Sequence, residues 1–166
     1  MFNLRSIPMR SFLILVSFLL FASVLGANQN AIIREVGPAT AERRVVLATE
    51  PTQFKDALIQ EMVRLLNDGN TFIQVINHAR NGLDRLDPRE YNAVFITNSG
   101  ATARVRSWVL NFLSRVSQYD QNVILHTTQT TVWTPPVKVD SITSASDMGA
   151  VRRLAQEMVD KIKKFF

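Results

Sequence analysis

Cysteine is absent from all 166 residues of the chain. This absence excludes disulfides, cysteine-ligated zinc, iron–sulfur clusters and thiol nucleophiles. Histidine is scarce: His78 and His126 have no histidine or carboxylate partner at metal-ligand spacing, so we expect no metal site. The composition, 46% hydrophobic and 20% charged, is ordinary for one globular domain. A domain of this size buries enough apolar surface to fold without a disulfide or a metal.

The first 27 residues have the pattern of a secretory signal. Arg5 and Arg10 precede an uninterrupted apolar run from Ser11 to Gly26, and small residues that could serve as a cleavage site follow near Ala27. The run is shorter than the roughly 20 residues of a comfortable membrane span. We expect residues 1–27 to act as a signal peptide or, if uncleaved, as an N-terminal anchor. Either outcome places the domain outside the cytoplasm, in a periplasmic or extracellular location.

The positive charge of the chain is too small to indicate a nucleic-acid partner. The formal charge is +5, and removing residues 1–27 takes away two arginines and no acid, which leaves +3. The basic residues are spread over several predicted helices, where solvated faces and helix C-termini account for them. We therefore expect contact with a membrane only through the N-terminal segment.

Short apolar runs alternate with helical patterns along the rest of the chain. Residues 28–42 lack periodicity and contain Gly37 and Pro38, which predicts a linker. Buried strands are predicted at 44–49, 71–77, 93–97, 122–127 and 137–142, and Gln74 indicates that the second strand is an exposed edge. Apolar stripes predict helices over 54–66, 105–116 and 151–165, whereas 79–91 predicts a short helix or a loop.

This alternation predicts an α/β fold. Strands that alternate with helices need crossover connections, which make the strands parallel and place helices on both faces of the sheet. We therefore expect a doubly wound sheet of five parallel strands in a domain that spans 43–166.

Polar residues follow the predicted strands at their carboxyl ends, where open parallel sheets bind ligands. These residues are Thr49 and Thr52; Thr97, Asn98, Ser99 and Gly100; Thr127 and Thr128; and Thr143, Ser144 and Ser146. Together with helix N-termini they would supply hydrogen-bond donors and positive dipole ends. We expect this edge to bind a small anionic or nucleotide-like ligand.

Two segments, VVLATEPTQFKDAL at 45–58 and LDPREYNAVFI at 86–96, together with the five strands, resemble the flavodoxin-like superfamily. The resemblance covers 44–166 and implies a flavodoxin-like fold. The resemblance lies in the arrangement of strands and helices along the chain more than in a specific sequence motif. Flavodoxins carry an S/T-x-T-G-x-T phosphate loop after the first strand, whereas this chain has Thr49-Glu-Pro-Thr52-Gln-Phe54. The glycine is missing, and Glu50 brings a negative charge to the place of a phosphate.

The resemblance implies FMN as a cofactor in one interpretation. The loops 97–100 and 128–133 would then flank the flavin ring, with Trp133 stacked on it; the alternative is that Trp133 packs its own loop onto the sheet. A second feature, Asp140-Ser-Ile-Thr143-Ser-Ala-Ser146, is similar to the D-x-x-S/T-G-A-T/S signature of covalent flavinylation, with Ser146 as the acceptor. Its alternative is an ordinary helix cap.

A hydrolytic site at His126 is a third interpretation. His126 precedes Thr127 and Thr128, and strand geometry lets His126 and Thr128 share a face. A hydroxyl nucleophile, however, also needs a group that orients the base, and the sequence indicates none.

Three functions therefore remain open from the sequence. The favoured one is a degenerate, exported flavodoxin-like module that acts by binding a ligand or an envelope protein. The alternatives are an FMN-dependent electron carrier and an envelope hydrolase.

Overall fold

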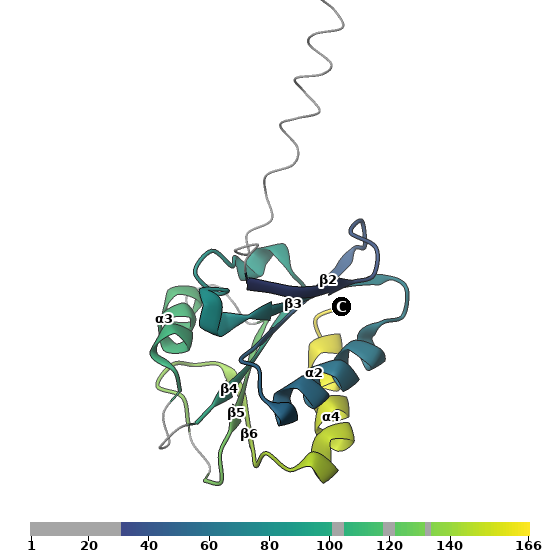
Figure 1. Cartoon of the computed structure of the whole chain (residues 1–166). Coiled ribbons are helices and arrows are strands. Elements are labelled where there is room, and N and C mark those ends of the chain that lie inside the picture. The colour runs from purple at the N-terminus through teal and green to yellow at the C-terminus, as the bar shows by residue number, and fades with distance from the viewer. Residues whose placement is uncertain (1–30, 101–104, 118–121, 132–133) are drawn as a thin grey trace, which may run out of the picture.

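A six-stranded sheet forms the centre of the protein (Figure 1). The computed structural model describes residues 31–100, 105–117, 122–131 and 134–166. The strands are β1 Ile32–Val36, β2 Arg43–Thr49, β3 Thr71–Asn77, β4 Ala93–Ser99, β5 Val123–Thr128 and β6 Asp140–Ser144. The helices are α2 Gln53–Leu66, α3 Ser107–Val116 and α4 Val151–Lys163, with short 3-10 turns η2 His78–Arg80, η3 Pro88–Glu90 and η4 Met148–Ala150.

The strand order across the sheet is β1-β3-β2-β4-β5-β6. All neighbours from β3 to β6 pair in parallel, and β1 pairs antiparallel with β3. Numbered along the chain, the five parallel strands have the order 2-1-3-4-5, which is that of the flavodoxin-like fold. The α/β architecture predicted from the sequence is therefore confirmed in its coarse form.

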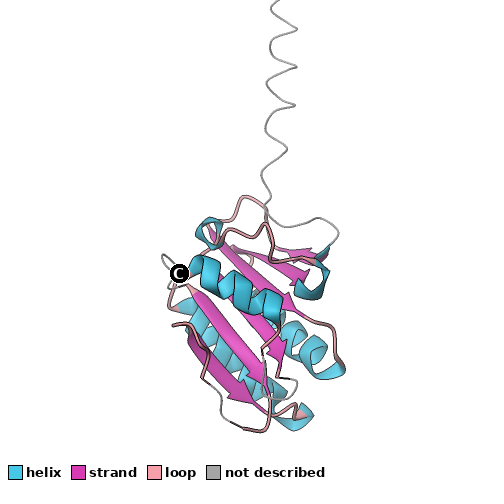
Figure 2. Cartoon of the chain, turned by 90° about the vertical axis from the view of Figure 1, so that its left-hand side faces the viewer, coloured by secondary structure: helices cyan, strands magenta, loops and turns pink. Residues whose placement is uncertain are grey.

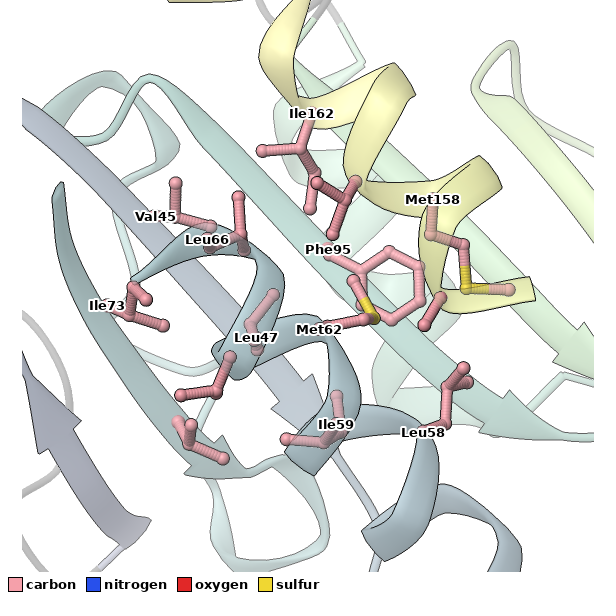
Figure 3. Packing of buried hydrophobic residues seen from close by; sticks show 14 of the residues in the cluster. Val45, Leu47, Leu58, Ile59, Met62, Leu66, Ile73, Phe95, Met158 and Ile162 are labelled. Carbon is pink, nitrogen blue, oxygen red and sulfur yellow. The ribbon is translucent and has the colours of Figure 1, made fainter. Parts of the chain in front are cut away.

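Buried side chains fill both faces of the sheet. On one face Leu47 and Phe95 pack with residues of α2 and α4, among them Met62 and Met158 (Figure 3). The neighbouring strand positions point the other way, so that Ile96 joins a second cluster with residues of α3. Helices accordingly lie on both sides of the sheet (Figure 2). This alternation explains why the central strands are apolar without a break.

The predicted number of five strands is wrong, because β1 adds a sixth strand within the segment 28–42. Its middle residues, Ile33 to Glu35, are exposed, so the segment lacks the apolar pattern of a buried strand. Gly37 ends β1 with a φ of 87°, and a Cβ atom there would lie 2.0 Å from the carbonyl oxygen of Thr71. Only glycine accommodates this close passage over the start of β3.

Two further predictions about the strands need correction. Gln74 was expected on an exposed edge, but β1 covers β3, and Gln74 is fully buried. Its amide donates to Glu35 (2.8 Å) and accepts from the hydroxyl of Tyr91 (3.2 Å). The last strand begins at Asp140 rather than at Val137.

Residues 1–27, predicted as a signal or an anchor, lie outside the described residues. Among the helices within the described ranges, none is long and apolar enough to cross a membrane.

Candidate functional site

The strand order places a crossing point between β2 and β4. The chain leaves β2 into α2 on one face of the sheet, and it leaves β4 toward α3 on the other. Crevices of this kind are where open α/β sheets bind ligands. Thr49 and Thr97, which end these strands, are paired neighbours in the sheet. The structure thus brings the predicted residues Thr49 and Thr97–Gly100 to one place.

A charged pair fills this crossing point. The Lys55 ammonium lies 2.8 Å from Oε1 of Glu50, and their side chains are only 1% and 11% exposed. The same ammonium donates to the hydroxyl of Ser99, and the backbone N–H of Ser99 donates to Oε1 of Glu50. The end of β2 and the end of β4 are therefore joined through one carboxylate.

A second cation reaches the same carboxylate from the start of α3. Nε of Arg106 lies 3.3 Å from Oε2 of Glu50, and the Arg106 side chain is 38% exposed. The backbone N–H of Arg106 donates to the Asn98 side chain (3.3 Å), which fixes the start of α3 beside β4. Both oxygens of Glu50 consequently face positive partners.

These contacts decide the charge states of the pair. Burial alone would raise the pKa of Glu50, but the hydrogen bonds from Lys55 and Ser99 outweigh burial and lower it to about 2. Burial lowers the pKa of Lys55 below its ordinary value, while the hydrogen bond to Glu50 acts in the opposite direction. At neutral pH Glu50 is therefore a carboxylate that compensates the charge of Lys55.

His78 lies beside this site and is buried. Its Nε2 lies 2.9 Å from the carbonyl oxygen of Thr97, and the indole N–H of Trp108 donates to its Nδ1 over 3.0 Å. A carbonyl only accepts and an indole N–H only donates, so the ring is the neutral tautomer protonated on Nε2. Burial lowers the pKa of His78 in agreement with this assignment.

His126 forms a second buried polar contact set, on the face of α2 and α4. Its Nδ1 lies 2.9 Å from the Thr97 hydroxyl, and its Nε2 lies 2.8 Å from the Ser144 hydroxyl. Thr128, the expected partner, instead donates to the carbonyl oxygen of Asn98 (3.3 Å). Burial and the nearby Lys55 lower the pKa of His126 to about 3.

The surroundings of His126 do not fit a general base for Ser144. The Ser144 hydroxyl donates to the carbonyl oxygen of Ala145 (3.2 Å), so Nε2 carries the proton and donates to Ser144. A base must accept the proton of its nucleophile, and it works best with a pKa near the operating pH. His126 therefore serves as a buried structural link between β4, β5 and β6.

The other predicted site residues are distributed around this edge. Thr52 caps α2 by accepting from the backbone N–H of Lys55 over 3.3 Å. Thr127 and Thr143 are paired neighbours of β5 and β6, the first buried and the second partly exposed. Ser146 is exposed in the segment between β6 and η4. Trp133 lies outside the described residues.

Sequence analysis missed the cationic half of the site. Lys55 and Arg106 were assigned no role, and Glu50 was identified only as a charge that disfavours phosphate. A signal for Lys55 was present, because it lies four residues before Ile59 and seven before Met62, on the buried stripe of α2. A lysine on such a stripe needs an internal anion.

The residues at the crossing point do not fit the phosphate of FMN. The phosphate would need the donors at the start of α2 and the end of β4, and the carboxylate of Glu50 already accepts from them. A phosphate at this position would lie beside the Glu50 carboxylate, and the two negative charges would repel each other.

Comparisons with known proteins support the fold and nothing finer. No protein-family model matches the sequence, and no curated protein matches it. Among solved structures, a lysine decarboxylase from Francisella novicida is similar with a TM-score of 0.51 and 7% identity, over 74% of this chain and 17% of the decarboxylase. A flavodoxin from the domain Archaea has a TM-score of 0.49 and 12% identity, over 72% of this chain and 99% of the flavodoxin. The order of the parallel strands, together with the similarity to the decarboxylase, shows a divergent flavodoxin-like fold.

Proposed function

We propose that this chain is an exported, doubly wound flavodoxin-like module that acts by binding a ligand or an envelope protein, and not by flavin electron transfer. The observation that carries this proposal is the Glu50 carboxylate at the crossing point of the sheet. It accepts hydrogen bonds from Lys55, Arg106 and the Ser99 backbone, which are the donors that a cofactor phosphate would use.

The surface of the module supports a binding role. Ile33 on the edge strand β1 is 54% exposed, and Met148 beside α4 is 49% exposed. Met148 lines a surface cavity of about 400 Å³ together with residues of α2 and α4, among them Arg64 and Arg152. Either surface is open to contact by an envelope partner.

A flavin titration tests the proposal. The purified full chain should be colourless, and FMN added to it should keep the absorption and fluorescence of free flavin. Reversible binding with a shifted flavin spectrum would overturn the proposal in favour of a noncovalent electron carrier.

Covalent flavin is the second candidate, because Ser146 of the flavinylation-like motif is exposed and so accessible to a modifying enzyme. Acid precipitation distinguishes it from the first candidate. Flavin that stays with the precipitate and disappears in Ser146→Ala would establish covalent attachment, whereas a colourless precipitate supports the binding module.

A further inference from the structure

Three hydrogen-bond donors from separate parts of the chain converge on the Glu50 carboxylate. The Lys55 ammonium comes from the first turn of α2, the Arg106 guanidinium from the start of α3, and the Ser99 backbone N–H from the end of β4. We call these three groups the cradle. They bring two positive charges and a backbone donor to one position.

The composition of the cradle is that of an oxyanion site. Ammonium, guanidinium and backbone N–H groups at a helix N-terminus are the usual donors to phosphate and sulfate. The Lys55 side chain is only 1% exposed, so its charge is held in place by its surroundings and does not reach into solvent. Lysine at the positive end of a helix is unfavourable unless an anion accompanies it.

Glu50 supplies that anion from within the chain. Its residue is 8% exposed, and it precedes α2 by only three positions, so its carboxylate is always close to the cradle. An attached group of this kind has an effective concentration far above that of a free ion in solution. A free oxyanion therefore competes poorly for the same donors.

We propose that Glu50 is an internal ligand of an oxyanion site, and that removing its carboxylate makes the cradle bind a free oxyanion such as inorganic phosphate. The inference rests on the proposed function, in which the Glu50 carboxylate occupies the donors at the crossing point. It concerns a different property, namely which anion these donors bind once the carboxylate is removed.

Glu50→Ala in the full chain tests the inference directly. The variant leaves Lys55 without its partner, so its melting temperature falls in chloride buffer. In about 50 mM phosphate the melting temperature should rise by roughly 5 °C relative to chloride of equal ionic strength. The wild type should show no such difference, because Glu50 occupies the cradle.

Two control variants separate site binding from general effects of salt and charge. Glu157→Ala removes a carboxylate from α4, where Glu157 pairs with Arg153 on the surface, and it should respond to phosphate like the wild type. Glu50→Gln removes the charge but keeps the volume of the side chain. Phosphate should therefore raise its melting temperature much less than that of Glu50→Ala. Adding Lys55→Met to Glu50→Ala should abolish the phosphate effect.

The inference is overturned if phosphate raises the melting temperature of Glu50→Ala no more than that of Glu157→Ala. Should Glu50→Ala not fold in chloride, Glu50→Ser provides a second variant, with a short polar side chain that does not fill the cradle. Folding of either variant in phosphate but not in chloride supports the inference, and failure of both in either buffer counts against it.

An FMN titration of the same variants distinguishes this inference from the proposed function. FMN binding to the wild type would defeat the proposed function. FMN binding to Glu50→Ala alone, together with phosphate binding, would identify Glu50 as the group that excludes the flavin phosphate. If Glu50→Ala binds phosphate but not FMN, the cradle can hold an oxyanion, but the residues around it do not bind a flavin ring.

Discussion

At the scale of single residues, the buried Glu50–Lys55 pair is expected to be costly to break. The Glu50 side chain is only 11% exposed, and replacing Lys55 with methionine removes its closest cation. Arg106 remains, with its Nε 3.3 Å from the carboxylate. Removing one partner of a buried pair typically costs about 3 kcal/mol or more. We predict a loss of about 3 kcal/mol for Lys55→Met, measured by urea unfolding.

The double variant Glu50→Gln, Lys55→Met provides the matched control, because it removes both charges. It should be more stable than Lys55→Met alone, since neither charge is then buried without its partner. Arg64→Met breaks the exposed pair with Glu61 and should change the free energy of unfolding far less than Lys55→Met does. An equal cost for Lys55→Met and Arg64→Met would contradict the prediction.

The two buried histidines make stability depend on pH. Burial lowers the pKa of His78 and lowers that of His126 to about 3, from an ordinary value of 6.5. The unfolded chain therefore binds protons more readily, and stability is retained above 6.5 and lost as the pH falls toward the folded values. We predict a decline of up to about 1.4 kcal/mol per pH unit for each histidine, followed by urea unfolding across this range.

The decline should begin before any carboxylate contributes. Glu50 has an ordinary pKa of 4.5 and a folded value of about 2, so its contribution is lost only below 4.5. His126→Gln keeps a hydrogen-bonding side chain that does not titrate, and it should reduce the slope between about pH 6 and pH 4.5. An unchanged slope in this variant would assign the pH dependence to other groups.

The residues of the site were only partly predictable from the sequence. Strand ends indicated Thr49 and Thr97–Ser99, because parallel strands end at one edge. The sequence could not show that His78 meets Trp108, since 30 positions separate them and the contact depends on how α3 packs. The pairing of Glu50 with Arg106 is likewise a product of strand order, across 56 positions.

At the scale of elements, predictability followed burial. The strands β2 to β5 were predicted because they are apolar on both faces, and α2, α3 and α4 because each buries one stripe. The start of the last strand was placed too early because Val137 and Val139 pack against the core from a loop. An apolar side chain in the sequence indicates that a position is buried, but it does not show whether that position belongs to a strand or to a loop.

Strand β1 carries a prediction of its own. It covers the edge of β3: Ile32 and Val36 are partly buried, and Ala31, just before the strand, is buried. The carboxylate of Glu35 also accepts a hydrogen bond from the buried amide of Gln74. A chain that starts at residue 43 should be less stable than one that starts at residue 31, by roughly 3 kcal/mol from the lost apolar burial. Thermal unfolding of the two chains measures the difference.

Ile33→Ala in the longer chain serves as the control. Ile33 is 54% exposed, so its truncation should cost under about 0.5 kcal/mol. If the two chain lengths unfold at the same temperature, β1 does not belong to the cooperative domain, and residues 31–42 act as a linker.

At the scale of the whole molecule, the alternation of strands and helices predicted the class of fold, whereas the order of strands came from the structure. Order matters most for function here, because β2 and β4 become neighbours only when β3 lies on the far side of β2. That arrangement creates the crossing point where Glu50 and Ser99 meet. Local patterns carry no information about which parallel strands become neighbours.

Export of the protein out of the cytoplasm can be tested with the N-terminal segment. Arg5, Arg10 and the apolar run 11–26 have the pattern of an export signal. Fusing residues 1–30 to an alkaline phosphatase that is active only outside the cytoplasm should yield an active enzyme. Leu15→Arg places a charge in the middle of the apolar run and should abolish most of the activity, because a signal requires an unbroken apolar region.

The mass of the exported full chain separates the two forms of export. Cleavage near Ala27 would leave the domain free, with only a few residues before β1. An intact N-terminus in the membrane fraction would mean that residues 1–27 stay attached as an anchor. Activity that persists in Leu15→Arg would show that export does not depend on the apolar run, and an inactive fusion of residues 1–30 without the substitution would contradict export by this segment.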